Sequence, residues 1–527
     1  MTVRQWFIIL SITLLPLVVF WSMYWPPAAW LLVLILPLVG RGFYDMLQRR
    51  HTGLRIYPLL GHIRYLFESI RMEIQQYFVE SETDGTPVNR EFRSLVYQRA
   101  KGDRDTRPFG TIFDVYVDGY EWINHSLAPC EIVEHNPRIV FGEGVCAQPY
   151  AASPLNISAM SYGALSKNAI MALNKGAKMG GFAHNTGEGG LSPYHQKYGA
   201  DIIWQIGTGY FGCRNTSGEF DAARFEQTAN LPIVKMIEIK LSQGAKPGHG
   251  GILPAAKVTE EIAAIRHVPM GQDVVSPPAH SSFNSPAGLL EFVVRLRELS
   301  GGKPVGFKLC IGNKSEFLGI CKAMIESGIR PDFITVDGSE GGTGAAPVEL
   351  TNSVGTPLRD GLIFVNRALR GTGLRQPIRL IAAGKALSAF HVIRLLALGA
   401  DTVNAARAMM FALGCLQSRS CNTDKCPTGI ATQDPARYKA LDIDLKGQRV
   451  ANYHKSMIHN LLELLAAAGV QKLEDLNPGH IHRRVGGTVV MNYDEMYPPI
   501  PDSCLLQEST MPDDWRTDWK LADAQRW

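Results

Sequence analysis

Residues 380–431 read LIAAGKALSAFHVIRLLALGADTVNAARAMMFALGCLQSRSCNTDKCPTGIA, and this stretch decides the fold. Two short apolar runs, residues 380–383 and 402–405, flank a segment with helical spacing. This pattern is typical of two parallel strands joined by a crossover helix. The stretch therefore predicts a parallel sheet, whose other strands the chain on either side must supply.

The loops after these two strands favour a phosphate site. Gly384 and Lys385 follow the first strand, and Ala405 and Arg407 lie at the end of the second. In a (β/α)8 barrel, the loops after the last two strands often bind phosphate through backbone N–H groups. We therefore expect a phosphate-bearing ligand between them.

Three cysteines follow the second loop. Cys415, Cys421 and Cys426 are spaced C-x5-C-x4-C and precede Pro427. Thiolates are soft ligands that suit iron–sulfur clusters, and three cysteines without an evident fourth indicate a [3Fe-4S] cluster rather than a four-iron cluster or zinc. Three buried structural cysteines are the alternative, since free cysteine is often buried. The adjacent phosphate loops favour the cluster.

The alternation of β-rich runs and helices continues back to residue 155. Eight candidate strands favour a closed (β/α)8 TIM barrel over an open doubly wound sheet, with helices such as residues 314–327 and 390–398 between them. No GxGxxG follows a strand, so we expect an external electron donor rather than nicotinamide binding in this chain. The eight runs are LNISAMSYGALS, GFAHNTGEGG, ADIIWQIGTG, VKMIEIKLSQGAKPGHGG, PVGFKLC, PDFITVDGSEGGTG, IRLIAAGK and DTVNAARA.

A cationic group follows the strand predicted within VKMIEIK. Lys240, Gln243 and Lys246 form K-x2-Q-x2-K, and Arg266 lies twenty residues beyond Lys246. Arginine can hold a carboxylate through two N–H groups while lysine supplies a point charge, so the group suits a dicarboxylate. A solvated basic loop is the alternative.

Other polar residues also lie on or after predicted strands. Glycines surround Glu188 and follow Glu340, and glycine allows a cofactor to approach the backbone closely. Lys308 lies inside the apolar run VGFKLC, where a lysine requires a partner. Either the edge of an electron-rich cofactor or a buried ion pair would serve.

The first fifty residues predict a membrane anchor. Residues 6–25 are almost wholly apolar and long enough to cross a bilayer core of roughly 30 Å, and residues 28–40 form a shorter second run. Positive charges flank both outer ends, which places them in the cytoplasm and predicts a transmembrane helical hairpin. A cleaved signal peptide is the alternative, although no clear small-x-small cleavage site follows the first run. The flanking charges are Arg4, Arg41, Arg49 and Arg50.

The composition agrees with an intracellular catalytic body. A net charge of +4 on 527 residues does not indicate nucleic-acid binding, and the nine cysteines, three of them clustered, fit a reducing compartment. Residues 59–80 predict an amphipathic helix that rests on the membrane or on the body. The rest of the chain outside the barrel is predicted to form a helix at 90–100, strands within 111–139, a loop at 433–447, a helix at 453–468, and a tail from Tyr497 that wraps the barrel or a second copy of the chain.

Five motifs, in order along residues 151–434, resemble the FMN and iron–sulfur synthase domain of glutamate synthase. The preceding REFRSLVYQRAKGDRDTRPFG resembles a membrane-anchored branch of the FMN-binding glutamate synthase family. The resemblance implies a (β/α)8 barrel with FMN at the carboxyl ends of its strands and a [3Fe-4S] cluster close by. The five motifs are ISAMSYGALS, HNTGEGG, KLSQGAKPGHGG, DGSEGGTGAAP and CLQSRSCNTDKCPTGIATQ.

The resemblance also implies roles for single residues. Glu188, Gln243 and Lys246 form the catalytic group, in which Glu188 handles a proton near the reacting carbon. Substrate or flavin contacts are assigned to Lys240, Gln243 and Arg266, and the cluster to Cys415, Cys421 and Cys426. The FMN-binding residues are Ser158, Ala159, Met160, Ser161, Lys308, Gly341, Gly342, Gly384, Lys385, Ala405 and Arg407.

The sequence also departs from the family it resembles. Glutamate synthases proper begin with a glutaminase domain whose nucleophile is an N-terminal cysteine, whereas here Thr2 precedes the predicted anchor. His249 replaces an acidic residue after KPG, and Ala279-His280 replaces a pair of histidines after SPP. These differences leave the ammonia source and the oxo acid open.

The sequence therefore predicts an enzyme that reductively aminates an oxo acid such as 2-oxoglutarate with ammonia or an amine. Electrons would come from ferredoxin or a separate reductase. The alternatives are an amino acid or amine dehydrogenase that passes electrons to a membrane carrier, and a non-enzymatic flavin and iron–sulfur redox module. The predicted domains are an inner-membrane hairpin (1–50), an α+β arm with linker helices (51–150), a cytoplasmic barrel with its iron–sulfur loop (151–434) and a C-terminal helix and tail (435–527).

Overall fold

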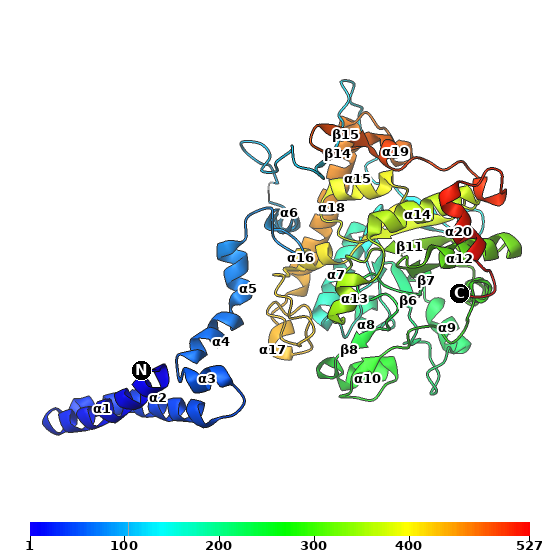
Figure 1. Cartoon of the computed structure of the whole chain (residues 1–527). Helices are drawn as coiled ribbons and strands as arrows, with labels where there is room; N and C mark the ends of the chain where they lie inside the picture. Colours follow the sequence, from blue (N-terminus) through cyan, green and yellow to red (C-terminus); the bar gives the residue numbers. More distant parts are fainter. Residues whose placement is uncertain (104) are drawn as a thin grey trace. The chain divides into compact units, whose positions relative to one another are not determined.

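Eight parallel strands close into a barrel, as predicted. The computed structural model describes residues 1–103 and 105–527, which divide into two units, Met1–Arg90 and Glu91–Trp527. The barrel lies in the larger unit (Figure 1). Its strands, each paired with the next and the last with the first, are β4 (Leu155–Ile157), β5 (His184–Asn185), β6 (Ile202–Ile206), β7 (Val234–Lys240), β10 (Val305–Leu309), β11 (Phe333–Asp337), β12 (Arg379–Ala383) and β13 (Thr402–Ala405).

Helices connect the strands, and several of them begin at side-chain caps. Ser166, Asp221, Ser285 and Ser388 each accept a hydrogen bond from a backbone N–H in the first turn of the helix that follows. The connecting helices are α7 (Lys167–Gly180), α8 (Pro193–Gln196), α9 (Ala222–Ala229), α10 (Glu260–Arg266), α11 (Pro286–Leu299), α12 (Lys314–Ser327), α13 (Val348–Ser353), α14 (Leu358–Gly371), α15 (Ala389–Ala397) and α16 (Arg407–Leu413).

The amino end of the barrel is closed by a hairpin of β2 (Ile139–Phe141) and β3 (Tyr150–Ala152). Phe141 packs edge-on against Phe333 at the start of β11, with the ring centroids 5.8 Å apart. The core at this end also includes Ile203 and Met236, near the starts of their strands. The polar residues of the site therefore lie at the opposite, carboxyl end.

The helices and strands outside the barrel differ in part from the prediction. The predicted loop at 433–447 is wrong, because α17 (Pro435–Tyr438) and the start of α18 (Ile443–Ala467) lie within it. Residues 111–139 hold one complete strand, β1 (Glu121–Ile123), which pairs with β14 (Ile481–Gly486) and through it with β15 (Val489–Asn492). The tail packs on its own barrel, where Trp515 stacks on Phe364. Further α-helices and strands of this unit are α6 (Arg90–Lys101, whose first residue belongs to the smaller unit), β8 (Ile252–Leu253), β9 (Val274–Val275), α19 (Tyr493–Met496) and α20 (Asp513–Leu521).

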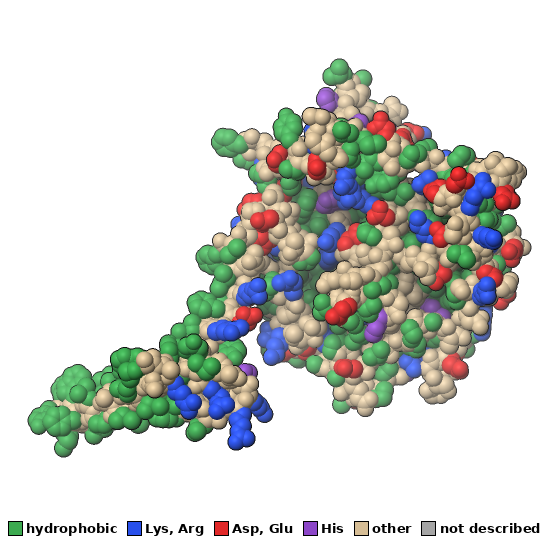
Figure 2. Space-filling model, viewed as in Figure 1, with side chains coloured by type: hydrophobic (Ala, Val, Ile, Leu, Met, Phe, Trp, Pro, Cys, Tyr) green, Lys and Arg blue, Asp and Glu red, His purple; other side chains and the backbone are tan. Residues whose placement is uncertain are grey.

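The smaller unit begins with a helical hairpin. Its helices, α1 (Val3–Tyr24) and α2 (Trp30–Leu47), are long and apolar enough to cross a membrane, by length and composition. Most of their residues are exposed, and Figure 2 shows hydrophobic side chains over the hairpin. The amphipathic helix predicted for residues 59–80 is divided into α4 (Gly61–Ser69), α5 (Arg71–Ile74) and a π-helical turn, η2 (Gln75–Val79), after a short α3 (Thr52–Ile56).

Candidate active site

A hydrogen-bonded triad occupies the carboxyl end of β7. Lys240, the last residue of that strand, donates from Nζ to Glu188 Oε1 and to Gln243 Oε1, each at 2.7 Å. Glu188 lies in the loop after β5, and Gln243 lies in the loop after β7. The structure therefore brings together three residues that the sequence assigned to catalysis and substrate binding.

Glycines make room for the Glu188 carboxylate. A Cβ atom on Gly251 would lie 2.3 Å from Glu188 Oε1, and one on Gly207 would lie 2.6 Å from Glu188 Cβ. Gly187 has a φ of +64° and presses against the backbone of Met160 and Ser161. Only glycine allows these loops to approach so closely, which explains the glycine-rich HNTGEGG motif.

Arg266 reaches the same site from the last turn of α10. Its Nη2 donates to Tyr162 O at 3.0 Å and to Ser161 Oγ at 3.3 Å. Its buried Nε has no hydrogen-bond partner among the described residues, and neither does Gln243 Nε2. A ligand with acceptor oxygens would satisfy these two buried donors.

The charges of the site are strongly coupled. Burial alone would raise the pKa of Glu188, but Lys240, Lys246 and Arg266 outweigh burial and lower it, so Glu188 is ionised at neutral pH. Burial lowers the pKa of Lys246 to about 8, with a further contribution from Lys240, although Glu188 opposes the shift. Burial also lowers the pKa of Arg266 to about 10. The site therefore holds more positive than negative charge at neutral pH.

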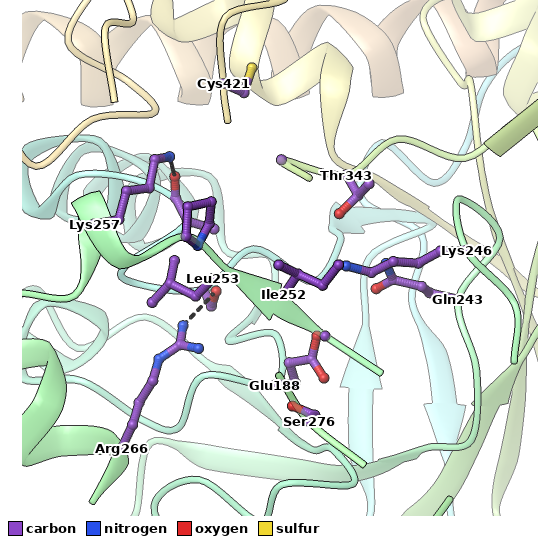
Figure 3. A pocket seen from close by; sticks show the side chains of 15 residues that line it. Glu188, Gln243, Lys246, Ile252, Leu253, Lys257, Arg266, Ser276, Thr343 and Cys421 are labelled. Carbon is purple, nitrogen blue, oxygen red and sulfur yellow. Dashed lines mark hydrogen bonds between the residues drawn. The ribbon is translucent and has the colours of Figure 1, made fainter. Parts of the chain in front are cut away.

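Glu188, Gln243, Lys246 and Arg266 line one pocket, which Figure 3 shows from close by. The pocket reaches the cysteine loop, because Cys421 belongs to its wall. Its lining residues are Ser161, Ala164, Glu188, Gln243, Lys246, Gly251, Ile252, Leu253, Pro254, Lys257, Arg266, Ser276, Thr343, Gly344 and Cys421.

Lys308 lies in register beside Lys240, on the neighbouring strand β10. It forms a buried ion pair with Asp337, with Nζ 3.0 Å from Oδ2. Burial would lower its pKa, but Asp337 and Glu238 raise it, so Lys308 is charged. The ion pair that the sequence left as an alternative is therefore present, and it holds the ammonium group at the carboxyl end of the barrel.

A second cationic group lies at the ends of β12 and β13. Arg407 Nη2 donates to Glu340 O at 2.7 Å, and a Cβ on Gly342 would lie 3.3 Å from Arg407. Burial and Arg407 together lower the pKa of Lys385, so the two cations are neighbours. Ala405 O accepts a hydrogen bond from Ser158 N, which ties this group to the residues 158–161 loop. The predicted phosphate loops therefore present two cations together.

The three predicted cluster cysteines are free and lie in one loop after α16. Burial raises the pKa of Cys415 and of Cys421, and Cys426 raises both further, so the three thiols lie near one another. Within residues 1–103 and 105–527, however, no three His, Cys, Asp or Glu side chains are arranged closely enough to hold a metal ion. The donor chemistry fits an iron–sulfur cluster, but these thiols do not converge on one point in this structure.

Sequence reasoning missed two buried charged residues. Lys257 is 1% exposed, donates to Ala164 O at 3.0 Å, and interacts electrostatically with Cys421, Cys426 and Asp424. Glu238, inside the barrel, accepts hydrogen bonds from Asn185, Gln205 and Thr335. Each could have been found as a charge within an apolar run, ILPAAKV or MIEI.

Ser166 links the start of α7 to the end of the cysteine loop. Its Oγ caps α7 through Ala169 N and donates to Gly429 O at 2.7 Å. We expect Ser166→Ala to lower the free energy of unfolding by about 2 kcal/mol, because both the cap and the partner of a buried carbonyl are lost. Urea titration would measure this change. The control Ser388→Ala removes a cap without a link to the cysteine loop, and an equal cost in both variants would contradict the linking role.

Comparisons with known proteins agree with this geometry. The family model for the conserved region in glutamate synthase matches residues 127–471, more than half of the chain. The glutamate synthase large subunit-like protein YerD of Bacillus subtilis is 38% identical over 488 residues, which cover 85% of this chain and 92% of YerD.

Two further relatives match a shorter part of this chain. The archaeal NADPH glutamate synthase of Methanocaldococcus jannaschii is 39% identical over 325 residues, covering 62% of this chain and 60% of that protein. The ferredoxin-dependent glutamate synthase 2 of Arabidopsis thaliana is 31% identical over 338 residues, covering 60% of this chain and 20% of the plant protein. The chain belongs to the glutamate synthase family of oxidoreductases.

Proposed function

We propose that this protein binds FMN and a [3Fe-4S] cluster and reductively aminates a dicarboxylate oxo acid such as 2-oxoglutarate. The observation that carries the proposal is the pocket in which Lys246 and Arg266 flank the ionised Glu188. Two buried cations with an unsatisfied donor suit two carboxylates, and a carboxylate beside them suits proton transfer.

The residues around the second cationic group fit a flavin phosphate. Arg407 and Lys385 would hold its charge, and the glycines of the adjoining loops would allow it to approach the backbone. Bound FMN would supply hydride to carbon and convert single electrons to pairs. The residues that would hold it are Ser158, Ala159, Met160, Ser161, Lys308, Gly341, Gly342, Gly384, Lys385, Ala405 and Arg407.

The chain's own side chains would orient the substrate. Arg266 and Lys246 would neutralise the two carboxylates, and Gln243 Nε2 would donate to an oxygen of the oxo acid. Glu188 accepts from Lys240 through Oε1, so its other oxygen would accept a proton from ammonium as the imine forms. Lys240 would keep Glu188 ionised and fixed in place.

Cys415, Cys421 and Cys426 would ligate the cluster, which would relay single electrons from ferredoxin or a separate reductase. Two observations support this assignment. The thiols lie near one another, and the buried ammonium of Lys257 interacts electrostatically with Cys421 and Cys426. Cluster binding requires the loop to bring the three sulfurs together.

The hairpin of α1 and α2 would anchor the protein in the inner membrane, with the barrel in the cytoplasm. Arg4 lies in the first turn of α1, and Arg49 and Arg50 follow α2, which favours cytoplasmic ends. The hairpin also favours a second candidate function, oxidation of an amino acid with transfer of electrons to a membrane carrier.

Flavin spectra under anaerobic conditions distinguish amination of an oxo acid from oxidation of an amino acid. Reduction of the flavin by ferredoxin, followed by reoxidation with an oxo acid and ammonium, supports synthesis. Reduction by an amino acid without a reductase supports the second candidate. Protein that contains neither flavin nor iron after anaerobic purification would contradict both.

Substrate affinity should depend on the protonation of Lys246. Its pKa of about 8 means that the ammonium loses its charge within the accessible pH range. We expect the Kd for 2-oxoglutarate to rise as the pH rises through about 8, by up to tenfold per pH unit. Calorimetry on the FMN-loaded protein would measure this. Lys246→Arg should move the rise to higher pH, because arginine stays charged; an unchanged profile would contradict the role.

A further inference from the structure

The helices that follow the hairpin expose a continuous apolar stripe. Its members recur at intervals of three or four residues, which places them on one side of the α4–η2 segment. None of the residues of α4, α5 or η2 is buried. The exposed members are Ile63 (49%), Leu66 (59%), Phe67 (56%), Ile70 (40%), Tyr77 (61%) and Phe78 (84%).

Such a stripe is costly in water. Removing large apolar side chains from water is favourable, and soluble monomers rarely expose large contiguous apolar patches. Figure 2 shows that hydrophobic side chains continue from the hairpin onto this part of the smaller unit. A surface or molecule that the smaller unit does not itself supply must therefore contact the stripe.

The end of the hairpin fixes where the stripe begins. Asp45 lies near the end of α2 and is fully buried. Its carboxylate accepts a hydrogen bond from Leu59 N at 3.2 Å and lies 2.8 Å from His62 Nε2. Arg41 lies 3.5 Å from the same carboxylate. The start of α4 is therefore held against the end of α2, the point at which a membrane hairpin reaches the bilayer surface.

The net positive charge of residues 41–79 favours an anionic surface. Residues 41–79 contain six arginines and no lysine against three acidic residues, of which Asp45 pairs with His62 and Glu68 lies 3.9 Å from Arg71 at the surface. Arginines close to an anionic leaflet are attracted to its phosphates. The arginines, all exposed, are Arg41, Arg49, Arg50, Arg55, Arg64 and Arg71.

We propose that residues 52–79 lie in the headgroup region of an anionic membrane leaflet, with the stripe toward the acyl chains and the arginines on phospholipid phosphates. An amphipathic, arginine-rich segment attached to a hairpin has the composition of an interfacial membrane helix. This inference rests on the proposed membrane anchor. It assigns the segment a lipid partner rather than the barrel or a second copy of the chain.

Photo-crosslinking in the full-length protein tests the inference. The photoreactive residue p-benzoylphenylalanine would replace Phe67, on the stripe, or Tyr65, on the opposite side of α4, in nanodiscs of phosphatidylcholine with phosphatidylglycerol. Mass spectrometry would identify the adducts. We expect about tenfold more lipid adduct at position 67 than at position 65. Adducts with the barrel or a second chain, or equal lipid labelling at both positions, would overturn the inference.

Two further measurements test the preference for anionic lipid and the membrane anchor separately. The combined variant Arg55→Gln, Arg64→Gln, Arg71→Gln should lose enrichment of phosphatidylglycerol over phosphatidylcholine around the protein, and unchanged enrichment would overturn the anionic preference. Alkaline carbonate extraction reports on the hairpin alone. Extraction of the chain would contradict the anchor, whereas a retained chain without lipid adduct at position 67 would overturn only the interfacial stripe.

Discussion

Replacement of Arg266 by alanine is expected to weaken 2-oxoglutarate binding by about 100- to 1000-fold, since losing one partner of a buried charge pair costs about 2–5 kcal/mol. The guanidinium is fixed by Tyr162 O and Ser161 Oγ, and its unpaired Nε remains for a ligand. The guanidinium of Arg266 is already fixed, so it loses little conformational entropy when a carboxylate binds. A large share of the affinity should therefore depend on this side chain. Calorimetry on the FMN-loaded variant would measure the change.

A matched control separates substrate binding from general damage. Arg224→Ala removes an exposed arginine of α9 that pairs with Asp221, the N-cap residue of that helix. It should leave the affinity unchanged, and both variants should keep their flavin. If Arg266→Ala bound the dicarboxylate as tightly as the control, the substrate would lie elsewhere.

Replacement of Cys421 by serine is expected to remove the iron. A [3Fe-4S] cluster with three thiolate ligands has no spare donor, so one alcohol in place of a thiolate should prevent assembly. We expect the loss of about three iron atoms per chain after anaerobic purification, together with the loss of the cluster's electron paramagnetic resonance signal. FMN content should persist, because the flavin residues lie on other loops.

The cysteines outside the loop supply the control. Cys130→Ser alters a free, half-buried thiol that contacts Ala466 O, and it should keep its full iron content. Equal iron in Cys421→Ser and Cys130→Ser would contradict the assignment of Cys421. In that case, the three thiols would be structural.

The barrel could be predicted because each of its strands carries a local signal. β6 and β10, for example, are fully buried runs that the sequence shows as apolar stretches followed by glycine or a loop. The site residues follow the ends of these strands, so their convergence could be expected from topology alone.

The features that sequence reasoning missed depend on contacts between distant parts of the chain. The predicted loop at 433–447 ends at Gly447, but this glycine lies within α18, where a Cβ would come within 3.1 Å of Lys175 on α7. Close helix packing, not a turn, therefore requires that glycine. Similarly, Asp337 becomes the partner of Lys308 only through the parallel pairing of β10 with β11. No local pattern reveals such a partner.

We propose that the pocket around Glu188, Lys246 and Arg266 couples a flavin to amination of an oxo acid. This coupling can be measured in a single turnover: the anaerobically reduced protein is mixed with 2-oxoglutarate and ammonium, and the flavin spectrum and the amino acid formed are followed together. We expect reoxidation of the flavin with one glutamate formed for each flavin oxidised. A flavin that stays reduced with every oxo acid offered, or that reoxidises without forming an amino acid, would contradict it.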